Sequence, residues 1–245
     1  VAPAAGIGEQ YASGFRALRR SQPFRALLGA FLLQALATGT MLAGAQYVAT
    51  WVLRSEDAVT FVFVALVGPA LVATPVWTVI ARRVGKERAF GIASVIFAVA
   101  ALSMTLLIWV PGPWIFAPVA IAGAAYAGLQ SLPLAMLPDT VAYDAQTNGP
   151  GRAGTFSGVW TAGETAGLAF GGTILSIVLA VTGFIATEGD RVVAQPASAI
   201  VGIILSFSVI PAVLRLLSLI SLARYPLRKA DIDALVRDTP APPTG

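Results

Sequence analysis

The chain has 245 residues, of which 57% are hydrophobic and only 11% are charged, whereas soluble domains carry roughly 25% charged residues. The formal net charge of +4 is not gathered on a polar domain, so it does not indicate a nucleic-acid-binding protein. Without Cys or His, the chain offers no disulfide framework and no zinc or haem ligands. The composition therefore predicts an integral membrane protein without a metal site and without a nucleic-acid partner.

Long apolar runs without charge predict six membrane-spanning helices. No charged residue occurs at 26–53, at 58–81 or at 89–138. About 20 apolar residues are needed to cross the hydrocarbon core, where a helix satisfies its own backbone. Pro111-Gly112-Pro113 divides the longest run, because proline removes a helical donor. In chain order, we expect the spans at 26–52, 58–81, 89–110, 114–137, 153–183 and 196–223, with a polar turn at 139–152 between the fourth and the fifth.

The two ends of the chain lack such runs. Residues 1–23 are predicted to form a cytoplasmic arm or linker, and they lack the apolar core and cleavage site of a signal peptide. Residues 24–225 form the predicted transmembrane bundle, and 226–245 a cytoplasmic tail whose Pro-rich end is disordered. Within the tail, 227–238 has the pattern of an amphipathic helix on the membrane surface, and a solvated tail fits equally well.

The basic residues predict the orientation in the membrane. Thirteen of the 16 Lys and Arg residues fall before the first span, in the second-to-third and fourth-to-fifth gaps, and in the tail. The opposite gaps hold only Arg54 and Arg191. The positive-inside rule then places both termini in the cytoplasm. The sequence thus predicts an all-α, multi-pass protein of the cell membrane, with the lipid bilayer as its surroundings.

Glu164 is expected near the middle of the membrane, about eleven residues or roughly 16 Å into the fifth span. A carboxylate at that depth is protonated or paired, because desolvation disfavours its charge. Trp160 and Thr161 lie one turn earlier on the same side. An aromatic ring beside an acid suits a sugar or another polyol. The alternative is a structural acid that pairs with a basic residue of a partner bundle.

Other polar residues within the predicted spans also allow two interpretations. Tyr126 and Gln130 share a helix face in the fourth span, and Gln34 lies in the first. They either line a cavity or join neighbouring helices by hydrogen bonds. Arg215 lies about eight residues from the cytoplasmic end of the last span, and its long side chain is expected to extend to the interface. Alternatively it pairs with a carboxylate such as Glu164.

The rest of the sequence indicates helix packing rather than catalysis. Glycines recur every four residues from Gly163 to Gly171, and such a stripe lets another helix approach closely. There is no nucleophile–His pair, phosphate loop or metal cluster in the sequence, and its Gly-rich stretches lie inside predicted helices. We therefore expect neither an enzyme nor catalytic residues.

Three segments resemble a known family. Residues 21–28 (SQPFRALL) resemble the entry to the seventh helix of a major facilitator superfamily (MFS) transporter, and 75–88 resembles its eighth helix with the basic loop that follows. Residues 132–144, followed by the loop at 147–154, are similar to the end of helix ten and the connection into helix eleven. Together they resemble the C-terminal six-helix half of the glycoside–pentoside–hexuronide:cation symporters, the family of the melibiose permease.

This resemblance implies a twelve-helix transporter of two six-helix bundles, with substrate bound between them and alternating access. The N-terminal half would belong to the same longer chain or to a separate polypeptide. No cofactor is implied beyond a coupling cation, Na+ or H+. In such transporters, charges in the cytoplasmic loops form salt bridges between the bundles, and the Arg residues among them also set topology. The candidates here are Asp139, Asp144, Arg152, Arg82 and Arg83.

The leading interpretation is the C-terminal bundle of a secondary active transporter. It would carry a sugar, a glycoside or a similar small polar solute by cation-coupled symport. The alternatives are a lysolipid-type carrier and a non-transporting membrane subunit of a larger complex. The candidate substrate or coupling residues are Glu164, Trp160, Thr161, Tyr126, Gln130 and Gln34.

Overall fold

The computed structural model describes residues 21–55, 57–149, 153–186, 194–228 and 231, and within them every regular element is a helix. Six helical segments are long and apolar enough to cross a membrane, as predicted. The elements are α2 (Gln22–Tyr47) with a π-helical turn (Val48–Leu53), α3 (Ala58–Val84), α4 (Lys86–Ser103) with a 3-10 turn (Met104–Ile108), a second 3-10 turn (Pro113–Ile115), α5 (Phe116–Asn148), α6 (Ala153–Val181), α7 (Ala197–Phe207) and α8 (Val209–Ala223). The chain is thus a multi-pass, all-α membrane protein.

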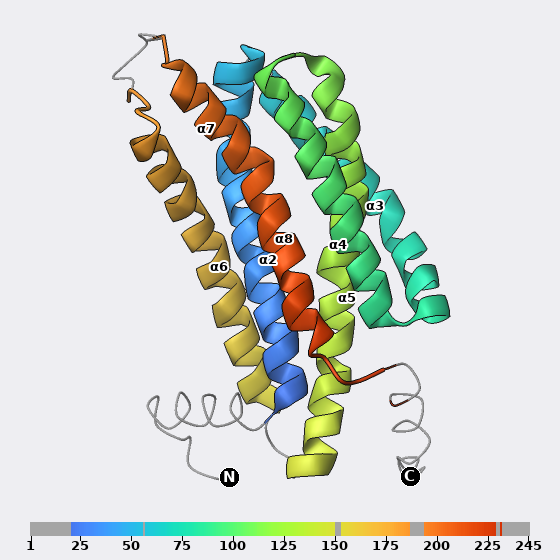
Figure 1. Ribbon diagram of the computed structural model, residues 1–245. Helices are drawn as coiled ribbons and strands as arrows, with labels where there is room; N and C mark the ends of the chain where they lie inside the picture. Colours follow the sequence, from blue (N-terminus) through green and yellow to red (C-terminus); the bar gives the residue numbers. More distant parts are fainter. Residues whose placement is uncertain (1–20, 56, 150–152, 187–193, 229–230, 232–245) are drawn as a thin grey trace.

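The helices run alternately up and down in one bundle, with α6 and α3 at its two flanks (Figure 1). Helix α2 packs against α6 and α8, while α5 packs against α3 and α4. Helices α4 and α8 join the two groups. One end of the bundle, here named the basic end, carries Arg82, Arg83, Lys86 and Arg224. The opposite end carries Arg54.

The flanking helix α3 leaves much of its apolar surface uncovered. Only Ala58, Val62 and Trp77 are buried along its whole length. Large apolar side chains on the rest of it are exposed, among them Phe61, Val64, Val67, Leu71 and Val72. In water such a surface would be strongly unfavourable, whereas lipid or another apolar helix can cover it.

Helix α5 is longer than the sequence predicts. The expected turn at 139–152 is wrong for most of its length, because the helix continues past Pro138 to Asn148. Proline removes only one backbone donor, and contacts with other helices hold the extension. Lys86 pairs with Asp139, and the hydroxyls of Thr140 and Tyr225 lie 3.2 Å apart. The helix ends at Gly149, whose φ of +91° favours glycine.

The last span has the predicted limits but is interrupted. Helix α7 ends at Phe207 and α8 begins at Val209. The break at Ser208 follows from Pro211, which has no N–H to donate to the carbonyl of Phe207. The Ser208 hydroxyl donates to the Ile204 carbonyl at 2.7 Å. The backbone N–H groups of Ser208 and Ala212 still donate to the carbonyls four residues earlier, so the two helices remain joined across the break.

Glycines bring α6 and α2 into close contact, as the sequence predicts. A Cβ atom on Gly163 would lie 2.8 Å from Leu32 Cδ2, and one on Gly167 would lie 2.7 Å from the Ala35 side chain. At Gly171 a Cβ would overlap the backbone of Thr40. The small-residue stripe on α6 is thus covered by α2.

We expect Gly171→Ala to lower the free energy of unfolding by about 1–3 kcal/mol, because the added methyl group has no space against α2. Thermal unfolding of the purified protein in lipid nanodiscs measures this loss. The matched control is Gly172→Ala, whose Cβ would meet nothing within 4 Å. Equal melting temperatures for the two variants would contradict the close contact.

Candidate functional site

Arg215 on α8 points into the bundle, where its side chain is 1% exposed. Its Nη1 donates to Gln34 Oε1 and its Nη2 donates to Thr38 Oγ1, both at 2.9 Å. Gln34 and Thr38 lie one turn apart on α2, so the two acceptors match the fork of the guanidinium. The Phe97 ring lies under the group, with its centroid 3.8 Å from Cζ. The expected extension of Arg215 to the interface is therefore wrong.

Gln34 is a member of a buried hydrogen-bond network rather than an open cavity wall. Its Oε1 accepts from Arg215, and its Nε2 donates to Ser94 Oγ at 3.2 Å and to Ser218 Oγ at 3.4 Å. Ser218 in turn donates to the Arg215 carbonyl at 2.6 Å. The network joins α2, α4 and α8 and fixes the position of the guanidinium.

The buried charge of Arg215 has no acidic partner among the described residues. The ion pairs there are Lys86–Asp139 and Arg228–Glu87. Pairing with Glu164, one alternative from the sequence, is not found in this arrangement. Arg215 Nε also lacks a hydrogen-bond partner in the described part of the chain. Because arginine does not lose its proton in proteins, a full positive charge lies inside the span with only neutral partners.

Arg215 is one of the residues that line a pocket of about 140 Å³, here named the Arg215 pocket. Its polar lining consists of Thr38, Tyr126 and Arg215. The Tyr126 ring is half-buried, and its centroid lies 5.9 Å from Arg215 Cζ. The remaining lining is apolar: Met41, Leu42, Phe63, Leu66, Val67 and Phe97. A mostly apolar pocket with a few polar residues in its lining is typical of small-molecule sites.

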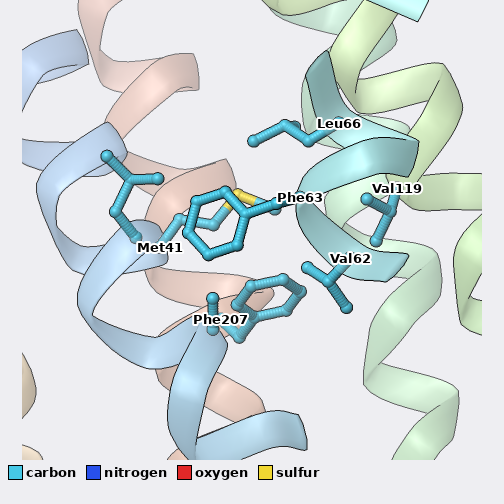
Figure 2. A pocket seen from close by; sticks show the side chains of 8 residues that line it. Met41, Val62, Phe63, Leu66, Val119 and Phe207 are labelled. Carbon is cyan, nitrogen blue, oxygen red and sulfur yellow. The ribbon is translucent and has the colours of Figure 1, made fainter. Parts of the chain in front are cut away.

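An adjoining hollow of about 10 Å³ is lined only by apolar side chains. Figure 2 shows Phe63 of α3 lying beside Met41 of α2 and Phe207 of α7 in this hollow. Met41 and Phe63 line both spaces. Leu42, Phe63 and Val67 are also exposed at the surface, so the apolar side of the Arg215 pocket faces outward between α2 and α3.

Glu164 is half-buried on α6 and, within the described residues, has neither a hydrogen bond nor an ion pair. Thr161 is exposed one turn before Glu164. Gln130 is half-buried on α5 and does not line the Arg215 pocket.

Trp160 does not form the open aromatic platform expected beside Glu164. Its side chain is 2% exposed and stacks on Phe31 of α2, with ring centroids 3.9 Å apart and an interplanar angle of 19°. Trp160 belongs to the face of α6 that carries Gly163 and Gly167, and α2 covers that face. The ring is therefore not available for stacking on a ligand in this arrangement.

The charged candidates at the basic end have different surroundings. Lys86 Nζ lies 2.6 Å from Asp139 Oδ2 and also donates to the Ala135 carbonyl at 2.9 Å. Asp144 is 1% exposed and accepts a hydrogen bond of 2.8 Å from Asn148. Arg82 and Arg83 are exposed, whereas Arg152 lies outside the described residues, as do most of 1–23 and of the tail. Asp139 is thus engaged within the chain itself.

Tyr225 follows α8 at the same end and is buried against α5. Its hydroxyl lies 3.2 Å from Thr140 Oγ1. Burial raises the pKa of Tyr225 to about 12, although the hydrogen bond with Thr140 acts in the opposite direction. The phenol therefore stays neutral at physiological pH and connects the end of α8 to the α5 extension.

Sequence reasoning missed Thr38, Phe97, Ser94 and Ser218 as neighbours of Arg215. Two local signals were present. Gln34 and Thr38 are spaced by four residues, and Ser218 follows Arg215 by three, so each pair shares a helix face. These faces meet only in the folded bundle.

Comparison with known proteins agrees with this architecture. The family described as MFS/sugar transport protein matches residues 8–229. An uncharacterized symporter of Synechocystis sp. (strain ATCC 27184 / PCC 6803 / Kazusa) is 28% identical over 187 residues, which is 75% of this chain. The match covers only 34% of that protein's length.

Proposed function

Because the chain belongs to the MFS/sugar transport protein family, we propose that it is the C-terminal six-helix bundle of a secondary active transporter. Its cargo is a sugar, a glycoside or a similar small polar solute, coupled to Na+ or H+. The observation that carries this proposal is the Arg215 pocket, a mostly apolar pocket inside the bundle whose lining includes Thr38, Tyr126 and Arg215. The similarity to a protein named as a symporter supports the coupling.

The partner of this bundle is an N-terminal bundle of six spans, in the same chain or in a separate polypeptide. The exposed apolar face of α3 supports such a partner, because a packed bundle would cover it. Glu164 and Thr161 on α6, together with the opening of the Arg215 pocket, then face the space between the bundles. Substrate reaches them from one side of the membrane at a time as the bundles rock.

Glu164 is the proposed coupling or substrate-binding acid. Its lack of a partner among the described residues supports this role, since an unpaired carboxylate at this depth is unfavourable unless it serves a function. Tyr126 and Thr38 are the proposed hydrogen-bonding groups of the pocket. Asp139, Asp144, Arg82, Arg83 and Arg152 remain candidates for the gate at the basic end.

Transport by the complete assembly in proteoliposomes tests the proposed function. We expect uphill accumulation of a labelled sugar or glycoside that stops when the Na+ or H+ gradient is collapsed with an ionophore. Accumulation of lysolipid instead would favour the lysolipid carrier. Stable assembly without movement of any solute would favour the non-transporting subunit.

The protein is proposed to lie in the plasma or inner membrane of the cell. Its basic end then faces the cytoplasm. Because the chain contains no Cys, single substitutions can be labelled without background. We expect a membrane-impermeant maleimide to label Asp57→Cys in intact cells and to label Asn148→Cys only after permeabilisation. The reverse pattern would overturn the orientation.

A further inference from the structure

We propose that Arg215 is the specificity-determining residue of the pocket and that it selects a cargo carrying an oxyanion, such as a carboxylate. This inference rests on the proposed function and specifies the chemistry of the cargo. Three observations carry it: a buried cation with no carboxylate partner among the described residues, a donor with no acceptor among them, and a pocket of suitable size that Arg215 lines.

The first observation concerns charge. Gln34 and Thr38 each accept one hydrogen bond from Arg215, but as neutral groups they do not neutralise its charge. The Phe97 ring contributes a cation–π contact, which is weaker than a counter-ion. A cation at this depth is usually paired or faces a ligand pathway. A negative group supplied by the cargo would complete the environment of the guanidinium.

The second observation concerns hydrogen bonding. A guanidinium has five N–H donors, and its planar fork matches the two oxygens of a carboxylate. Nη1 and Nη2 each make one hydrogen bond, and Nε makes none in the described part of the chain. The Thr38 hydroxyl can rotate away from Nη2, so that an anion in the pocket replaces it as acceptor. Gln34 then continues to hold the guanidinium in place.

The third observation is the pocket itself. Its volume of about 140 Å³ is close to the roughly 150 Å³ of an engineered cavity that binds benzene. One ring-sized part of a ligand therefore fits. Leu42, Phe63 and Val67 are the exposed residues of the lining, whereas Arg215 is its buried, charged residue. This arrangement favours a cyclic acid that enters with its charged group first.

Glu164 does not supply the negative charge that Arg215 lacks. The face of α2 that contacts α6 carries Ala35 and Gly39, whereas Arg215 binds Gln34 and Thr38 of the same helix. Glu164 is not part of the pocket lining. A carboxylate of the partner bundle is the competing source of negative charge, and the experiment below separates it from a cargo.

Ligand-induced thermal stabilisation of the complete assembly in nanodiscs tests the proposal. Two pairs of probes differ in charge but little in size: glucuronate against glucose, and benzoate against benzamide. We expect at least one acid to raise the Tm by about 3 °C or more at saturating concentration, and its neutral counterpart not to do so. Arg215→Gln should abolish the shift, and Arg215→Lys should reduce it. Arg224→Gln, which removes an exposed charge near the end of the same helix, should leave it unchanged.

A second pair of variants keeps the test independent of the folding of the Arg215 variants. Val67→Phe fills the mouth of the pocket from an exposed position, and Val64→Phe adds the same ring one turn earlier, outside the lining. We expect only Val67→Phe to abolish stabilisation by the acid. The proposal is overturned if no acid stabilises the wild type, or if Val67→Phe or Arg215→Gln keeps the full shift. One further result would overturn the proposal: Arg215→Gln detaches the partner bundle but still binds the acid better than its neutral counterpart. Arg215 would then pair with a carboxylate of the partner bundle instead of the cargo.

The same preparation separates this proposal from the proposed function. Uphill uptake of glucose or another neutral sugar at equal rates by wild type and Arg215→Gln would support the transporter and reject the oxyanion. Binding of the acid to Arg215 without uphill uptake of any solute would support the oxyanion site and reject the proposed transport.

Discussion

Glu164→Gln is expected to abolish uphill accumulation of substrate while the amount of protein in the membrane stays near that of the wild type. The substitution keeps the size and hydrogen-bonding capacity of the side chain and removes its titratable charge. Because Glu164 has no hydrogen bond or ion pair among the described residues, the change breaks no contact seen within the bundle. Uptake in proteoliposomes under an imposed Na+ or H+ gradient measures the effect, and Asp57→Asn at an exposed position outside the helices is the control.

Exchange without a gradient separates the two roles proposed for this acid. Downhill exchange should survive in Glu164→Gln if the carboxylate couples transport to the cation, and it should be lost if the carboxylate binds the cargo. If Glu164 instead pairs with a basic residue of the partner bundle, the variant should lose roughly 3–5 kcal/mol of stability, as for other broken buried pairs. Uphill transport at the wild-type rate would remove Glu164 from the mechanism.

Gln34→Leu is expected to have the largest effect on stability. The substitution removes the acceptor of Arg215 Nη1 and the donor to Ser94 and Ser218 at the same time. A buried charged donor without its acceptor costs about 3 kcal/mol. Thermal unfolding in nanodiscs measures the loss. Gln46→Leu on the same helix is the matched control, since Gln46 is exposed and donates a hydrogen bond of 3.4 Å to Thr50.

A double variant tests the cause of that loss. In Gln34→Leu/Arg215→Leu the charge and its acceptor are removed together, and two apolar side chains replace them. Such replacements are often neutral or stabilising, so most of the stability should return. If the double variant were as unstable as the sum of the single ones, the loss would arise from packing rather than from the stranded charge.

The six spans could be predicted because they depend on local composition. A run such as 58–81 without charge has few alternatives to a membrane helix. The glycines from Gly163 to Gly171 predict a close helix contact through their spacing alone. The length of α5 could not be predicted in this way. Polar residues after Pro138 are equally compatible with a turn and with a helix that leaves the bilayer, and contacts with Lys86 and Tyr225 decide between them.

The direction of the Arg215 side chain could not be predicted from the sequence either. Arg215 has partners that lie 181 and 177 residues away in sequence, and nothing in the last span alone distinguishes a side chain that reaches the interface from one that enters the bundle. Trp160 lies one turn before Glu164 on α6. The glycine stripe determines which face of α6 is covered by α2, and Trp160 lies on that covered face. Local spacing identified polar and aromatic residues, and tertiary packing determined which of them remain accessible.

The backbone contact between α2 and α6 has a mechanical consequence. Where glycine meets backbone, as at Gly39 against Leu168 and Gly171 against Thr40, there are no side chains that could change rotamer to absorb a displacement. We therefore expect the two helices to move as one stiff pair, so that a tilt of α6 is transmitted to α2. An event at Glu164 that tilts α6 would then also shift Gln34 and Thr38 relative to the guanidinium of Arg215, without contact between the acid and the arginine.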